Sequence, residues 1–197
     1  MNDIEAIVIG GSAGALDALL AILPALPEQV SCPIVIVLHL APAQPSLVPE
    51  ILSRISARAV HEAEDKAQLR DQTIYVAAPN YHLLIERNRS LSLSVDDPVH
   101  HSRPALDVLF ESAADAYGPA VAGLVLSGAN QDGAEGLAKI HETGGVAIVQ
   151  SPATASSPMM PEAALRRVGP SAHVVPLGDI AAFLSRLFGA KSRSFPC

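Results

Sequence analysis

The sequence predicts an α/β fold in which a mostly parallel sheet lies between two layers of helices. Apolar runs typical of strands alternate with segments of helical periodicity along the 197 residues. Runs such as Pro33–Leu40 (PIVIVLHL) are continuously apolar, as strands buried on both faces are. The apolar fraction of 49% also fits a large core. We therefore expect a doubly wound three-layer α/β/α sandwich with a local antiparallel hairpin.

The expected strands are short and are bounded by glycine, proline or polar residues. They are Ile4–Ile9, Pro33–Leu40, Ala59–Glu64, Thr73–Ala78, His82–Glu86, Leu91–Val95, Ala120–Leu126, Gly145–Gln150 and His173–Pro176. Tight turns at Pro79-Asn80 and Asn88-Arg89 join the three strands in the middle of the chain. These turns predict the antiparallel hairpin, or a three-stranded meander.

The expected helices have apolar residues at intervals of three and four positions. They are Ala15–Leu26, Ser46–Ile55, Pro104–Ala116, Gly133–Thr143, Pro161–Val168 and Asp179–Phe188. Ser46 is a candidate N-cap, and Pro104 would occupy the first turn of its helix. With no linker long enough to divide the chain, we expect one domain over residues 1–189 and a flexible tail over residues 190–197.

Composition argues against several classes of protein. The net charge of −7 would repel phosphate backbones, and 4% aromatic residues without tryptophan give little surface for stacking bases. No apolar run is long enough to span a membrane, and the acidic N-terminus is unlike a signal peptide. Cys32 and Cys197 form no metal or disulfide pattern. We expect a cytoplasmic monomer that inserts into no membrane, binds no nucleic acid and needs no metal or organic cofactor.

Ser12 is the first candidate catalytic residue. It lies in Gly10-Gly11-Ser12-Ala13-Gly14, between an expected strand and an expected helix. The segment lacks the lysine of a phosphate-binding P-loop. It also has Ser12 near the place where a dinucleotide-binding fingerprint needs its middle glycine. It does match G-x-S-x-G, the turn that exposes a nucleophilic serine beside free helix N–H groups. The alternative is that Ser12 only caps the helix.

His39 and Asp132 are the second and third candidates. Each follows an apolar strand, as Ser12 does, and functional groups gather at the carboxyl ends of parallel strands. His39 could instead be a core histidine, and Asp132 with Glu135 fits a helix capping box. Three strand ends that carry Ser, His and Asp nevertheless favour a catalytic triad. The order Ser, His, Asp differs from that of α/β-hydrolases, in which the histidine comes last. His173 could be such a late histidine, but its neighbours fit the start of an ordinary strand, so this alternative is less favoured.

The sequence resembles the catalytic domain of the chemotaxis protein-glutamate methylesterases (CheB type). The resemblance rests on IVIGGSAGALDAL, IVIVLHLAP, TIYVAAPNYHLLI, HHSRPALDVLFESAADAYG, VAGLVLSGANQDGAEGLAKIHETGG and AIVQSPATASSPMMPEAAL, in family order over almost the whole chain. It implies an α/β/α sandwich that hydrolyses glutamate methyl esters on chemoreceptors and releases methanol, and in some members deamidates glutamine. It also implies Ser12 as nucleophile, His39 as general base and Asp132 as the partner of His39.

The chain departs from the family pattern in two motifs and in one domain. Gly128-Ala129-Asn130-Gln131-Asp132-Gly133 replaces the usual G-M-G-x-D-G, so Ala129 stands where the family has methionine. Ala15 replaces the last glycine of GxSxGG, and we expect no receiver domain ahead of the first strand. Two other functions remain open. One is a small-molecule esterase with the same triad, and the other is a non-catalytic relative that only docks on a receptor.

Three other segments have functional and structural interpretations. His100-His101 could hold a metal, but a solvated loop fits better because no nearby residue in the sequence completes a ligand set. Arg103 either lines the substrate cleft or pairs with an acid. Met159 or Met160 either lines the ester site or packs in the core.

Overall fold

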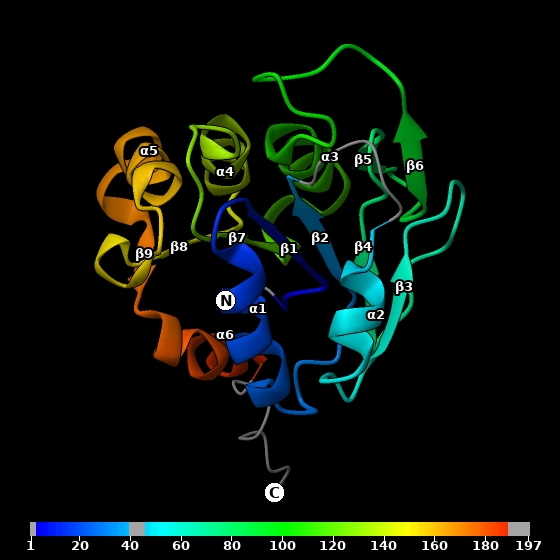
Figure 1. The fold of residues 1–197 in the computed structure, drawn as a ribbon, viewed down its shortest axis with the longest axis horizontal. Coiled ribbons are helices and arrows are strands. Elements are labelled where there is room, and N and C mark those ends of the chain that lie inside the picture. Colours follow the sequence, from blue (N-terminus) through cyan, green and yellow to red (C-terminus); the bar gives the residue numbers. More distant parts are fainter. Residues whose placement is uncertain (1–2, 40–45, 189–197) are drawn as a thin grey trace, which may run out of the picture.

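The computed structural model describes residues 3–39 and 46–188 (Figure 1). Seven parallel strands form the main sheet in the order β3-β4-β2-β1-β7-β8-β9. Their bounds are β1 Ala6–Gly11, β2 Ile34–Leu38, β3 Ala59–Glu62, β4 Thr73–Val76, β7 Val121–Val125, β8 Val146–Gln150 and β9 His173–Val175. A separate antiparallel pair consists of β5 (His82–Ile85) and β6 (Leu91–Ser94).

Helices cover both faces of the sheet, which confirms the three-layer sandwich. Their bounds are α1 Ala15–Ile22, α2 Val48–Ser53, α3 Leu106–Tyr117, α4 Ala134–Glu142, α5 Met159–Val168 and α6 Ile180–Phe188. The described residues also form five short 3₁₀ helices, which are η1 Leu23–Ala25, η2 Gly118–Ala120, η3 Pro152–Thr154, η4 Gly169–Ser171 and η5 Leu177–Asp179. In Figure 1, α1 and α6 lie on one side of the strands, and α3, α4 and α5 lie on the other.

Two apolar cores form because alternate residues of a strand point to opposite faces. On β1, Ile7 and Ile9 pack in the core under α1 and α6, whereas Ala6 and Val8 pack in the core under α3, α4 and α5. Both faces of the central strands are therefore buried, which explains their continuously apolar sequence. The hairpin β5–β6 contributes to the second core and packs against α3.

The direction of winding reverses at β1. The chain passes from β1 to β2 on one side and later returns to place β7 on the other side. In doubly wound sheets, ligands bind at the carboxyl ends of the strands beside such a reversal. Here those ends carry the segments after β1, β2 and β7, which contain all three candidate residues.

Three of the differences between the expected and the observed elements concern α1, β4 and α3. The first helix ends at Ile22 and continues as η1, because Pro24 lacks the N–H needed for further α-helix. Thr73–Val76 joins the parallel sheet as β4, so the antiparallel unit is a hairpin and not a meander. Pro104 precedes α3, which begins at Leu106.

Two further expectations concern capping and chain ends. The Ser46 hydroxyl accepts the Val48 N–H at 3.2 Å, although Leu47 is the residue at the N-cap position of α2. The end of the strand expected over Pro33–Leu40, at Leu40, lies outside the described residues, and so does the tail expected over residues 190–197. No helix in the described ranges is both long and apolar enough to cross a membrane.

Candidate active site

The turn that carries Ser12 depends on small residues. A Cβ on Gly10 would overlap the Leu106 side chain, and one on Gly11 would overlap Ala15 Cβ. Gly14 has a φ of 79°, which L side chains rarely adopt, and it occupies the N-cap position of α1. These glycines let β1 turn directly into α1 with Ser12 half-buried at the bend.

Ser12 does not cap α1, because Gly14 occupies the N-cap position and the hydrogen bonds among the described residues include none to the Ser12 hydroxyl. Its backbone N–H instead donates to the Ser127 carbonyl at 2.9 Å, which ties the turn to the end of β7. This N–H is therefore occupied and is a poor candidate for an oxyanion donor. The N–H of the residue after the nucleophile, here Ala13, is the donor that nucleophile elbows normally use.

His39 lies beside Ser12 because of the strand register. Gly11 pairs with Leu38 between β1 and β2, and the His39 N–H donates to the Gly11 carbonyl at 3.1 Å. The next residues along the two strands are Ser12 and His39. The His39 side chain is 12% exposed, so its ring remains accessible from one side.

Asp132 binds the His39 ring from the segment after β7. Its Oδ2 lies 2.7 Å from His39 Nε2, and its side chain is fully buried. Burial opposes ionisation of this carboxyl, but hydrogen bonds from His39 and from the N–H groups of Asp107 and Leu106 outweigh it. The pKa of Asp132 is consequently lowered. An ionised carboxylate only accepts hydrogen bonds, so His39 Nε2 carries the proton of this pair.

Asp132 is not the cap of α4, contrary to the capping-box alternative. Gly133 occupies the N-cap position of α4, and Glu135 pairs with Arg167 instead. The Asp132 carboxylate accepts the first N–H groups of α3, with Leu106 N at 2.7 Å from Oδ2 and Asp107 N at 3.0 Å from Oδ1. It therefore caps a helix from another part of the chain.

Asp107 caps α4 in return, and sequence reasoning missed it. Its Oδ1 accepts the Gly136 N–H at 2.8 Å, and its Oδ2 lies 3.3 Å from His100 Nε2. Burial is the main cause that raises the pKa of Asp107, to about 6, and the negative charge of Asp132 adds to it. No sequence spacing links Asp107 to Gly136, because the two are 29 residues apart.

Two more residues missed by sequence reasoning face the other ring nitrogen of His39. Ser102 Oγ and Asn130 Nδ2 each lie 3.4 Å from His39 Nδ1. Asn130 lies within the motif that contains Asp132, and Ser102 within the Ser-Arg-Pro segment. Among the described residues, His39 is hydrogen-bonded to Asp132. No hydrogen bond between Ser12 and His39 is present among them, although the two residues follow neighbouring strands.

Arg103 fixes the loop that carries Ser102. Its guanidinium donates to Asn80 Oδ1 at 2.9 Å and to the carbonyls of Val95 and Asp96 at 2.7 and 3.0 Å. Its described partners are thus an amide and two carbonyls, and not an acidic side chain.

A cavity of about 180 Å³ lies beside the ring of His39. Its lining residues are His39, Asn80, Pro98, His101, Ser102, Arg103 and Pro104. Arg103 therefore lines a cavity next to His39 as well as holding the loop.

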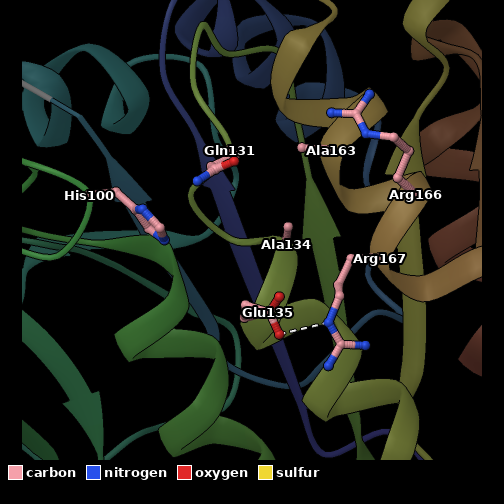
Figure 2. A pocket seen from close by; sticks show the side chains of 7 residues that line it. All are labelled: His100, Gln131, Ala134, Glu135, Ala163, Arg166 and Arg167. Carbon is pink, nitrogen blue, oxygen red and sulfur yellow. Dashed lines mark hydrogen bonds and ion pairs between the residues drawn. The ribbon is translucent and has the colours of Figure 1, made fainter.

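A larger cavity of about 330 Å³ lies between α4 and α5 (Figure 2). Figure 2 shows Gln131 and Glu135 on one side of it, the arginines of α5 on another, and His100 opposite. Arg167 is bound to Glu135 at 2.7 Å and lies 3.4 Å from Glu142. This cavity is more strongly charged than the one at His39, and Ser12 is not among the described lining residues of either cavity.

His100, Asp107 and Asp132 could geometrically hold a metal ion, since one ligand atom from each lies within 4.8 Å of the others. Their existing bonds oppose it. Both oxygens of Asp132 already accept hydrogen bonds, and each carboxylate lies at a helix N-terminus, whose positive potential disfavours a cation. From the sequence we expected no acidic residues near His100 that could complete a set of metal ligands. That expectation was wrong, because Asp107 and Asp132 lie close to His100 in the fold.

The remaining candidate residues divide between core and surface. Met160 is fully buried and contacts Gly128, so it packs in the core, whereas Met159 is 53% exposed. Ala129, which stands where the family pattern has methionine, is exposed. Burial, the largest cause, raises the pKa of the Cys32 thiol to about 12, so this thiol is no competing nucleophile.

Comparison with known proteins identifies relatives over nearly the whole chain. Residues 7–184 match the family model described as CheB methylesterase. A relative from Leptospira interrogans is 45% identical over 183 residues, which cover 93% of this chain and 94% of that protein. Its name carries protein-glutamate methylesterase and protein-glutamine glutaminase activities, provisionally assigned.

Longer relatives and a solved structure agree with this match. The protein-glutamate methylesterase/protein-glutamine glutaminase of Archaeoglobus fulgidus is 34% identical over 188 residues, covering 94% of this chain and 54% of that protein. This chain thus spans about half the length of that relative. The crystal structure of the Thermotoga maritima CheB methylesterase catalytic domain superposes with a TM-score of 0.88 at 28% identity, covering 94% of this chain and 100% of that chain.

Proposed function

Because the chain belongs to the CheB methylesterase family, we propose that it hydrolyses methyl esters of glutamate side chains in chemoreceptors, with Ser12, His39 and Asp132 as its catalytic triad. One observation supports the triad above the others. The His39–Asp132 hydrogen bond of 2.7 Å forms at the strand ends next to the Ser12 turn. Deamidation of glutamine at the same site is a second activity, favoured by the names of the relatives.

The proposed reaction is acyl transfer through Ser12. The Ser12 hydroxyl passes its proton to His39 Nδ1 while its oxygen bonds to the ester carbonyl carbon. The Ala13 N–H stabilises the resulting oxyanion, a contribution that is worth about 10²–10³ in rate for a typical donor. His39 then returns the proton to the leaving oxygen, and methanol departs.

Water completes the reaction. His39 Nδ1 accepts a proton from water, whose oxygen attacks the acyl-enzyme carbonyl. The bond to Ser12 breaks, Ser12 regains the proton from His39, and the product is a glutamate carboxyl group. Throughout, the negative charge of Asp132 stabilises the His39 imidazolium that forms in each half of the reaction. With glutamine as substrate, ammonia leaves in place of methanol.

The cellular setting is also part of the proposal. We propose that the protein acts as a cytoplasmic monomer on the methylated segment of a receptor. One feature supports this setting. The thiol of Cys32 is buried and free, as is usual in a reducing compartment.

Substitution of Ser12 tests the function. We expect Ser12→Ala to abolish methanol release from a methyl-labelled receptor fragment and to abolish labelling by a fluorophosphonate probe. The fold should persist, with a stability loss below about 1 kcal/mol, because the hydroxyl caps no helix. Ser127→Ala, at a neighbouring serine that bonds backbone groups, is the comparison variant for labelling. Near-normal turnover by Ser12→Ala would contradict the triad. If the protein hydrolyses small esters but releases no methanol from the receptor fragment, its substrate is a small molecule and not a receptor.

A further inference from the structure

Asn130 has a fixed orientation between Asp132 and His39. Its side-chain oxygen accepts the Asp132 backbone N–H at 3.2 Å, in a turn of the kind that asparagine commonly forms with the residue two positions on. A backbone N–H can only donate, so this contact identifies which end of the amide is oxygen. The other end, the NH₂ group, is therefore the one that lies 3.4 Å from His39 Nδ1.

The two ends of the His39 ring thus face groups of opposite kind. Nε2 faces the Asp132 carboxylate, which only accepts, and Nδ1 faces the Asn130 amide, which at this end only donates. Ser102 adds a hydroxyl near Nδ1 at 3.4 Å, and a hydroxyl can rotate to donate or to accept. Only the tautomer with hydrogen on Nε2 and a free lone pair on Nδ1 fits Asp132 and Asn130 together.

We propose that Asn130 is a positioning residue, which holds His39 in the tautomer whose Nδ1 takes the proton from Ser12. This inference rests on the proposed function, because it concerns the base of the same reaction. The 3.4 Å separation makes the amide a weak partner, so the Ser12 hydroxyl can approach the same lone pair during reaction.

Asn130→Asp is the most informative substitution because it keeps the shape of the side chain. The oxygen that accepts the Asp132 N–H can remain, while the donor that faces Nδ1 becomes an acceptor. Hydrogen on Nδ1 then becomes favourable, and the base nitrogen is blocked. Asn130→Ala removes the group without adding an acceptor, and Gln131→Ala changes an exposed neighbour as the matched control.

The ring nitrogens of His39 report the tautomer directly. We would label the full chain with ¹⁵N-histidine, assign His39 with the His39→Gln variant, and record ring nitrogen spectra from pH 5 to 9. In the unsubstituted chain and in Gln131→Ala, we expect neutral His39 to carry hydrogen on Nε2 alone. In Asn130→Ala we expect hydrogen mainly on Nε2, because Asp132 still accepts it, together with a detectable fraction on Nδ1. Asn130→Asp should carry hydrogen on Nδ1.

Activity provides a second readout. We expect Asn130→Ala to lower kcat about five- to tenfold, the size of one net hydrogen bond, with KM unchanged. Asn130→Asp should lower kcat further and move the rising limb of the pH profile to higher pH. Unchanged ring spectra and pH profiles in both Asn130 variants would overturn the inference, and so would hydrogen on Nδ1 in the unsubstituted chain. The expected spectra in a chain that hydrolyses no receptor ester would overturn the proposed function alone.

Discussion

The starts of α3 and α4 lie together at the edge of the sheet that carries the proposed triad, and each helix is capped by an aspartate that belongs to or precedes the other. Asp132, which precedes α4, accepts the first N–H groups of α3, and Asp107, in the first turn of α3, accepts an N–H of α4. Both aspartates are buried, at 0% and 5% exposure. Their pKa values nevertheless move in opposite directions, with that of Asp132 lowered and that of Asp107 raised to about 6.

The difference comes from the other partners of each carboxylate. Asp132 receives two backbone N–H groups and the ring N–H of His39 at 2.7 Å. Asp107 receives one backbone N–H, lies 3.3 Å from the exposed His100, and faces the charge of Asp132. Two residues of one type in similar caps can therefore play different parts, because the number and charge of their partners decide which carboxylate ionises readily.

Asp132→Asn tests the aspartate that binds His39, and we expect it to have the largest effect on kcat. The amide can place an N–H toward His39, which stabilises the wrong tautomer, so we expect kcat to fall by about 10⁴. Stability should fall by only about 1 kcal/mol, because one oxygen can still cap α3. Methanol release and urea unfolding measure the two quantities. A rate loss of less than tenfold would mean that Asp132 is mainly a helix cap.

Asp107→Asn tests whether the other aspartate affects stability and not catalysis. The folded-state pKa of Asp107, about 6, lies above the ordinary value of 3.8. Folded protein therefore binds more protons than unfolded protein between these values, and the contribution of Asp107 to stability is lost as pH rises through this window. We expect the free energy of unfolding of the unsubstituted protein to lose on the order of 1–3 kcal/mol from this group between about pH 4 and pH 6.

In Asp107→Asn that loss should disappear, and the variant should be at least as stable as the unsubstituted protein at pH 7. Urea titrations from pH 4 to 8 measure the change. Ester hydrolysis should stay within about fivefold of normal and should keep its rising limb with pH, since the proposed base is His39. If the rising limb vanishes with Asp107, the titrating group of the reaction has been misassigned.

His100→Ala tests the contribution of His100 to the pKa of Asp107, and we expect it to have the smallest effect of the three substitutions. His100 lowers the pKa of Asp107, so its removal should move that pKa upward and extend the loss of stability to higher pH. The change in unfolding free energy at pH 7 should stay within about 0.5 kcal/mol, because His100 is exposed. Carboxyl ¹³C titration of Asp107 measures the shift. A downward shift would show that His100 does not stabilise the charged form of Asp107.

Much of the fold could be predicted from local sequence. Continuous apolar runs identified the buried parallel strands, because both faces of β1 and β2 are covered. Helix ends were harder to place. Pro24 ended α1 earlier than its apolar spacing suggested, and α3 began after Pro104 because its cap, Asp132, comes from 26 residues further along the chain.

Three features could be recognised from the sequence alone. They are the turn of small residues at Ser12, the strand ends that carry His39 and Asp132, and the family resemblance. Each of these depends on neighbouring residues or on the order of motifs. Only the tertiary structure decided the partners of the aspartates and the donors at His39 Nδ1. Ser102 and Asn130 are 63 and 91 residues from His39, and side chains so far apart meet only through the winding of the sheet. Hydrogen bonds depend on distance and direction in space, which sequence spacing does not encode beyond one strand or one helical turn.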